Sequence, residues 1–125
     1  MEIKPDLVEE STMTITPEMS AIKVGSGLVD VFATPSMIAF IEKTCSDAIA
    51  DSLEQGKVSV GVEINAKHVL ASKIGNTVKC VARVLKTEKN KVLFTAVVID
   101  NDRIVGTASH TRCIVDKVKF LANVK

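Results

Sequence analysis

Glu42 and His68 are ionisable residues that fall on apolar faces of two predicted elements. At about 100° per residue, Glu42 lies between Ile49 and Leu53 on the wheel of a helix. A carboxylate at the edge of a buried stripe loses solvation, so it needs a partner or a raised pKa. His68 ends a strand on the face expected to point toward that helix. A carboxylate and an imidazole on facing elements can pair, which would orient the imidazole for acid–base chemistry.

Each of these residues also has a purely structural explanation. Glu42 could lean out to water at the edge of its stripe, and His68 could be a satisfied core histidine. Thr34 precedes Pro35 at the start of the same helix, where a threonine caps free backbone N–H groups and proline suits the first helical position. From the residues alone, both kinds of explanation stay open.

A long helix is predicted over residues 35–54, ending near Gln55 and Gly56, because glycine is the usual left-handed terminator. Apolar residues recur on it at spacings of three and four, at Met37, Ile38, Ile41, Cys45, Ala48, Ile49 and Leu53.

The rest of the chain reads as strands joined by short turns. Residues 1–10 are expected to be loosely held, a first strand covers 11–16, and 18–30 form a flexible approach to the helix. Further strands are predicted at 58–68, 77–86, 91–100 and 103–115, with a tight hairpin at Asn101-Asp102. The tail over 116–125 carries Val118, Phe120 and Leu121, which could still pack.

An unbroken strand over 58–68 would place one set of side chains toward the helix and the alternate set away from it. The first set is Val58, Val60, Val62, Ile64, Ala66 and His68, and the second is Gly61, Glu63, Asn65 and Lys67. Short connections favour antiparallel neighbours. We therefore expect one α+β domain over residues 1–125, a curved antiparallel sheet packed on one principal helix.

Composition excludes several classes of function. Sixteen basic and fifteen acidic residues give a formal charge of +1, and the aromatic residues are four phenylalanines, so we expect no nucleic-acid partner. Charged residues interrupt each apolar run before membrane-spanning length, and the N-terminus lacks the apolar run of a signal peptide. These features predict a cytoplasmic protein. The widely spaced Cys45, Cys80 and Cys113 indicate small buried residues and no metal site.

Several short motifs, in order, resemble those of hotdog-fold thioesterases of the fluoroacetyl-coenzyme A thioesterase branch. They are Phe32-Ala33-Thr34, Glu42, Val60-Gly61-Val62, Lys67-His68, Ala71-Ser72, Gly75, Gly106-Thr107, His110 and Arg112. The resemblance covers about 31–120 and implies a hotdog fold, in which the sheet wraps around the helix. Gly25-Ser26-Gly27-Leu28 stands where the fluoroacetate specialist has bulky aromatics, so fluoroacetyl specificity is not implied.

The resemblance implies hydrolysis of an acyl-coenzyme A thioester with Thr34, Glu42 and His68 as catalytic residues. Such hydrolysis needs a nucleophile, a base and donors to the oxyanion. Thr34 would be the nucleophile or would position the attacking water. Gly61 and Arg112 would bind substrate. Gly61 would donate its N–H to the oxyanion, and its structural alternative is a strand bulge. Arg112 would contact the acyl group or a coenzyme A phosphate, and its structural alternative is a surface salt bridge. His110 is expected to be structural.

No cofactor is expected, since coenzyme A is part of the substrate, and no metal is implied. Members of the fold usually pair their sheets, so we expect a homodimer or a dimer of dimers with the pocket near the interface. A non-catalytic module that binds acyl-coenzyme A or another apolar ligand is the alternative. A hotdog hydratase is less favoured, because no Asp/His hydratase signature is evident.

Overall fold

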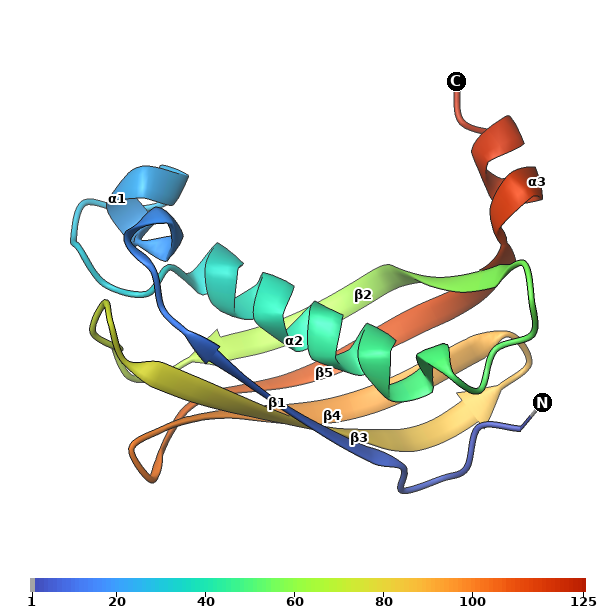
Figure 1. The fold of residues 1–125 in the computed structure, drawn as a ribbon, viewed down its shortest axis with the longest axis horizontal. Helices are drawn as coiled ribbons and strands as arrows, with labels where there is room; N and C mark the ends of the chain where they lie inside the picture. Colours follow the sequence, from blue (N-terminus) through green and yellow to red (C-terminus); the bar gives the residue numbers. More distant parts are fainter. Residues whose placement is uncertain (1) are drawn as a thin grey trace.

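A five-stranded antiparallel sheet curves around one long helix in the structure, a computed structural model that describes residues 2–125 (Figure 1). The strands are β1 (Val8–Thr14), β2 (Lys57–His68), β3 (Thr77–Glu88), β4 (Lys91–Asp100) and β5 (Arg103–Asp116). They are ordered β1-β3-β4-β5-β2, so β1 and β2 form the two edges. The α+β layout expected from the sequence is confirmed. Met1 lies outside the described residues.

The long helix α2 (Thr34–Ala50) lies across the concave face of the sheet, and two short helices flank it, α1 (Ala21–Val24) and α3 (Lys117–Ala122). The flexible approach expected over 18–30 is wrong in part, because Pro17–Met19 form a 3-10 turn and Ser20 caps α1 through the Lys23 N–H. Packing of the tail was left open by the sequence. In the structure α3 projects from the sheet, with Val118, Phe120 and Leu121 exposed at 78%, 41% and 57%.

The buried face of α2 supplies five of the sixteen residues of the hydrophobic core. Met37, Ile41, Cys45 and Ile49 are fully buried against the inner face of β3 and β4. Burial of such a side chain typically contributes about 1.5–3 kcal/mol, so this stripe holds the helix on the sheet. The helix ends at Ala50, earlier than the predicted residue 54.

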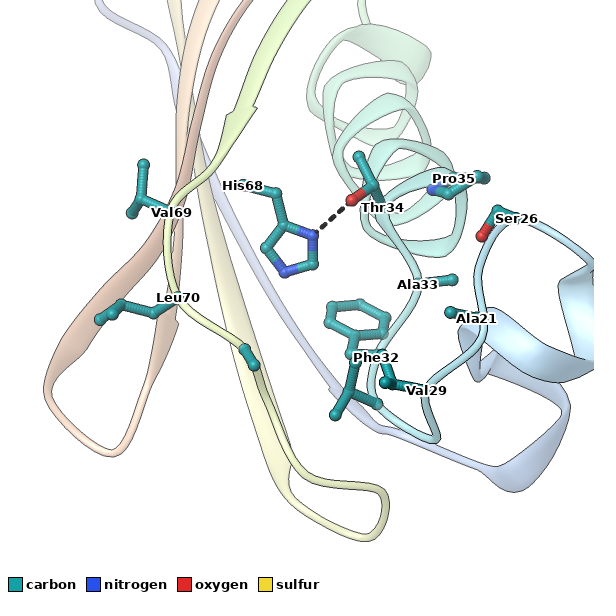
Figure 2. A pocket seen from close by; sticks show the side chains of 12 residues that line it. Ala21, Ser26, Val29, Phe32, Ala33, Thr34, Pro35, His68, Val69 and Leu70 are labelled. Atoms are coloured by element: carbon teal, nitrogen blue, oxygen red, sulfur yellow. Dashed lines mark hydrogen bonds between the residues drawn. The ribbon is translucent and has the colours of Figure 1, made fainter.

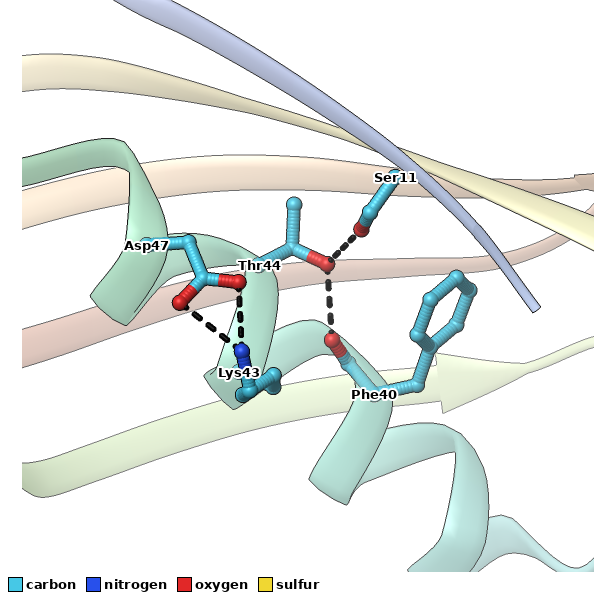
Figure 3. Close-up of polar contacts among 5 residues, drawn as sticks. All are labelled: Ser11, Phe40, Lys43, Thr44 and Asp47. Atoms are coloured by element: carbon cyan, nitrogen blue, oxygen red, sulfur yellow. Dashed lines mark hydrogen bonds and ion pairs between the residues drawn. The ribbon is translucent and has the colours of Figure 1, made fainter.

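Thr44 is a buried polar residue on α2 that the periodicity did not indicate. Its hydroxyl donates to the Phe40 carbonyl at 2.8 Å and lies 2.5 Å from Ser11 Oγ on β1 (Figure 3). The bond to Ser11 ties the middle of α2 to the edge strand β1. Lys43 and Asp47, by contrast, form an ion pair at the surface of the helix.

The N-terminal strand begins earlier than the sequence indicated. Val8–Thr14 pair with β3 in an unbroken register, and the N–H of Asp6 donates to Val84 O, so most of the segment expected to be loose is hydrogen-bonded. The hairpin between β4 and β5 is confirmed. Asn101 and Asp102 both have positive φ, at 49° and 66°, which two-residue hairpin turns require and which these residue types tolerate.

A bulge in β2 overturns the expected alternation of its side chains. Gly61 pairs with Arg112 and Glu63 pairs with Thr111, so Val62 is an extra residue between them. One inserted residue moves the side chains of all earlier residues of β2 to the opposite face of the sheet. Gly61 therefore lies on the helix-facing side together with His68. Val58 and Val60 therefore face outward, contrary to the prediction.

Candidate active site

Thr34 and His68 meet where α2 begins and β2 ends. Thr34 Oγ1 and His68 Nδ1 lie 2.8 Å apart, joined by a hydrogen bond across 34 residues of sequence (Figure 2). The expected capping role of Thr34 is wrong, because Ala33 is the N-cap and no side chain caps the helix. The Thr34 hydroxyl is therefore committed to the imidazole and not to the backbone of its own helix.

The His68 imidazole is poised to exchange a proton. Burial lowers its pKa from the ordinary value, so the neutral ring dominates at neutral pH. The edge of Phe32 packs against it, with ring centroids 6.0 Å apart and planes at 78°. Its Nε2 is buried and has no hydrogen-bond partner within residues 2–125. A neutral ring bonded to a hydroxyl on one side and unpartnered on the other can accept a proton from Thr34 or from water.

Both residues line a pocket of about 320 Å³, which we call the helix-end pocket. Its remaining walls come from the segment before α2 and the loop after β2, and they are mainly apolar (Figure 2). The other lining residues are Ala21, Ser26, Val29, Val31, Phe32, Ala33, Pro35, Val69, Leu70 and Ala71. No charged side chain lines it, so the pocket suits an uncharged group.

Glu42 lies elsewhere, about 12 Å of helix rise beyond Thr34. The expected pairing of Glu42 with His68 is wrong, because the only side-chain hydrogen bond of His68 within the described residues goes to Thr34. The Glu42 carboxylate lies instead over Gly61. A Cβ on Gly61 would approach Glu42 Oε2 to 2.7 Å, so only glycine lets the carboxylate come this close to β2.

Arg112 and His110 face the same point from β5, and with Glu42 and Gly61 they form what we call the arginine cluster. A Cβ on Gly61 would also lie 3.2 Å from His110 Cε1 and 3.4 Å from Arg112 Nη1. A surface salt bridge for Arg112 is excluded, because the residue is 8% exposed and donates from Nε to Ser59 Oγ and from Nη2 to Ser59 O. Burial lowers the pKa of its guanidinium and nearby Glu42 raises it, with the net shift downward.

His110 was expected to be structural, and it lies within this cluster beside Arg112. It is 3% exposed and bonds both to Arg112 and to the backbone of Glu63 next to the bulge. Its two-residue spacing from Arg112 indicates that both side chains share one face of a strand, but not that they bond to each other.

The cysteines are not candidate nucleophiles. Cys45 and Cys80 are fully buried, and burial raises their pKa values to about 12 and about 11. A thiol with such a pKa carries almost no thiolate at neutral pH. The prediction of buried cysteines is confirmed for these two, whereas Cys113 is only half-buried. No helix within residues 2–125 is both long and apolar enough to span a membrane.

Comparison with known proteins identifies the family. Residues 15–118 match the family described as Fluoroacetyl-CoA-specific thioesterase. The fluoroacetyl-CoA thioesterase of Streptantibioticus cattleyicolor is 31% identical over 96 residues, which span 77% of this chain and 69% of that protein.

Solved structures share the fold. A phenylalanine-to-alanine mutant of the fluoroacetyl-CoA-specific thioesterase matches with a TM-score of 0.93 and 24% identity, covering 99% of this chain and 96% of that one. A hypothetical Thermus thermophilus protein described as a thioesterase superfamily member matches with a TM-score of 0.89 and 26% identity, covering 97% and 90%. The chain therefore belongs to the fluoroacetyl-CoA-specific thioesterase family, within the hotdog-fold thioesterases, and is a thioester hydrolase.

Proposed function

We propose that this protein hydrolyses an acyl-coenzyme A thioester to a carboxylic acid and free coenzyme A, with the reaction centred on Thr34 and His68. The hydrogen bond between Thr34 Oγ1 and His68 Nδ1, inside an otherwise apolar pocket, is the observation that carries the proposal. A hydroxyl held by a neutral imidazole is the arrangement that activates a weak nucleophile. Family membership supports the same reaction class.

Two routes fit this geometry. In the first, His68 takes the Thr34 proton as Oγ1 attacks the thioester carbonyl, coenzyme A leaves as the thiol, and water then hydrolyses the acyl-threonine. In the second, Thr34 positions a water molecule that His68, its hydrogen-bond partner, deprotonates. Rapid quench followed by mass spectrometry of the peptide containing Thr34 separates them, since only the first route leaves an acyl adduct. Both routes place one labelled water oxygen in the acid, so measurement of that label confirms hydrolysis but does not separate the routes.

Glu42 is the proposed second acid–base group. Its carboxylate lies over Gly61 on the same side of β2 as His68, although the two do not share a hydrogen bond. Gly61 and Arg112 are proposed to serve the substrate from the arginine cluster, Gly61 by close backbone approach and Arg112 by its positive charge. Because Arg112 is buried and bonded to Ser59, we do not assign it to the coenzyme A phosphates.

The apolar, uncharged lining of the helix-end pocket supports an acyl group without a charge. Related structures include a threonine-to-serine mutant of the fluoroacetyl-CoA thioesterase in complex with acetyl-CoA. The substrate panel should therefore compare acetyl-, butyryl-, hexanoyl- and succinyl-coenzyme A. We expect turnover of neutral acyl groups and little turnover of the carboxylated one.

Thiol release by the wild type, Glu42→Ala and His68→Ala is the decisive test. Loss of activity in both variants, with folding retained, supports the site, whereas undiminished activity in both would rule it out. No thiol release by the wild type from the whole panel would argue for the alternative of a non-catalytic binding module.

A homodimer is also proposed. Strand β2 is an edge of the sheet and carries twelve residues whose outer backbone groups have no neighbouring strand in the described chain. Exposed edges of this length are usually covered, and sheet pairing through β2 would bring a second chain beside Gly61. Light scattering should give the mass of a dimer or a larger assembly, and a stable monomer at micromolar concentration would remove this proposal.

A further inference from the structure

The hydrogen bonds of His110 determine its protonation state. Nδ1 lies 2.8 Å from the carbonyl oxygen of Glu63, and a carbonyl can only accept, so Nδ1 carries a hydrogen. Nε2 lies 3.1 Å from Arg112 Nη1, and a guanidinium can only donate, so Nε2 offers a lone pair. His110 is therefore the neutral Nδ1–H tautomer. It links the bulge of β2 to the guanidinium of Arg112.

Glu42 and Arg112 are close without being paired. Both reach the same point beside Gly61, yet no ion pair between them is found anywhere in residues 2–125. The Arg112 guanidinium is held by Ser59, through Nε and Nη2, and by His110, through Nη1. Opposite charges at short range in a partly buried site attract strongly, so something must keep them apart. The acceptor at His110 Nε2 takes one of the two N–H groups of Nη1 and so fixes the position of Nη1.

We propose that His110 is a positioning residue, which as a hydrogen-bond acceptor holds Arg112 Nη1 away from Glu42 and so keeps the Glu42 carboxylate unpaired for the reaction. This inference rests on the proposed function, in which Glu42 acts as an acid–base group. A carboxylate in a direct ion pair with arginine is a weaker base, because the pair stabilises its charged form. Removal of the acceptor should therefore let Arg112 close onto Glu42 and slow the chemical step.

The surroundings of His110 favour the neutral form. The charged and titratable groups that face it are Arg112 on β5, Glu42 on α2 and, next to Arg112, the Cys45 thiol; on β4 it meets Phe94, with ring centroids 6.1 Å apart and planes at 28°. Burial lowers the pKa of His110, the Glu63 carbonyl raises it, Arg112 lowers it and Glu42 raises it, with a net shift downward. The ring thus remains an acceptor at neutral pH.

Two substitutions separate the hydrogen bonds of His110. In His110→Gln, the amide oxygen can stand near the position of Nε2 and accept from Arg112, but the bond to Glu63 is lost. In His110→Asn, the amide nitrogen can stand near Nδ1 and donate to Glu63, but the acceptor for Arg112 is lost. Thr111→Ser is the matched control, because Thr111 is the next residue on β5 and faces away from the helix.

The expected result is that His110→Asn lowers kcat by about tenfold or more with KM changed less than about twofold, whereas His110→Gln keeps kcat within about threefold. If His110 only braces the bulge, the order is reversed, with Asn active and Gln impaired, and the proposal is overturned. Equal activity of both variants and the wild type overturns it as well. Thermal unfolding of each variant identifies a loss that is due to misfolding.

Nuclear magnetic resonance tests the inference without reference to activity. The chain has two histidines, so the imidazole nitrogens of His110 can be assigned by comparison with His68→Gln. We expect the Nδ1–H tautomer at neutral pH, and a change in the Arg112 Nε resonance in His110→Asn that is absent in His110→Gln. An Nε2–H tautomer, or an Arg112 resonance unmoved in both variants, would contradict the proposal even if the wild type hydrolysed no thioester tested. A wild type that hydrolyses nothing, with these resonances as expected, would instead contradict the proposed function.

Discussion

The helix-end pocket and the arginine cluster lie on the same side of the sheet but are built in opposite ways. Thr34 and His68 come from the ends of two elements, share one hydrogen bond and leave Nε2 of His68 unpartnered. Arg112 and His110 come from the middle of a strand, and their side chains are buried and bonded several times over. A side chain that reacts needs a donor or acceptor atom that is free of other hydrogen bonds. A side chain that positions another group needs its own hydrogen bonds made, because they hold it in place. This difference supports our proposal that the bond-making step takes place in the helix-end pocket.

The largest expected effect is on the helix-end pocket. His68→Ala removes the proton acceptor of Thr34 and should lower kcat by about 10²–10⁴-fold, measured as thiol release. Lys67→Ala is the control, because Lys67 precedes His68 on β2 and faces outward. If His68→Ala and Lys67→Ala had equal activity, the reaction would have to be assigned elsewhere, and the contrast between the two regions would fail.

The arginine cluster is tested by Gly61→Ala. The new Cβ would meet Glu42 Oε2 at 2.7 Å, so the carboxylate, which is the end of a flexible side chain, must move; we expect reduced kcat and a loss of no more than about 1 kcal/mol of unfolding free energy. Glu42→Ala removes the obstructing atom. In a double-mutant cycle followed by denaturant unfolding, Gly61→Ala should therefore cost less in the Glu42→Ala background. An equal cost in both backgrounds would mean that close approach of Glu42 is not what requires glycine.

A buried polar contact outside both regions should affect stability alone. Thr44→Val keeps the shape of the side chain but removes the hydrogen bonds to Phe40 O and Ser11, so we expect a loss of about 1 kcal/mol in unfolding free energy. Thiol release should be unchanged. Lys43→Ala, which removes an exposed ion pair one residue away, should cost less. A large loss of activity in Thr44→Val would show that the middle of α2 contributes more to the site than its packing.

The smallest expected effect is a pH dependence shared by the two regions. Burial lowers the pKa of His68 and of His110 from the ordinary 6.5. Below pH 6.5 the unfolded chain therefore binds more protons than the folded one, so stability is fully present above 6.5 and is lost as the pH falls through the folded pKa values. Denaturant unfolding between pH 7.5 and 5 should show this decline. His110→Gln should make it shallower, and an unchanged slope would mean that His110 does not contribute.

Much of the fold follows from local patterns. The helix and the four strands after it were predicted to within a few residues, because periods of 3.6 and 2 and the turn residues between them are properties of neighbouring residues. The first strand was predicted too late, since Val8–Glu10 carry little apolar signal and are held by pairing with β3. Helices α1 and α3 were missed because they are short and hold their first turns by caps at Ser20 and Asp116.

The candidate site could be predicted residue by residue but not as an arrangement. Thr34, Glu42 and His68 were singled out from the sequence and the resemblance that it carries. The residue that each of them contacts was not predicted. The bulge at Val62 and the position of Thr34 as the first residue of α2 cannot be seen in the pattern of residue types. An inserted strand residue leaves the composition unchanged and yet reverses which side chains face the helix.

The sequence by itself determined the class of fold and the set of polar residues available to the site, since both depend on residue types and short-range spacing. The tertiary structure alone decided that His68 bonds to Thr34, that Glu42 lies over Gly61, and that Arg112 is buried behind His110. The first two contacts join residues 34 and 19 positions apart, which meet only because the bulged β2 closes against α2 and β5, and such long-range geometry is set by packing.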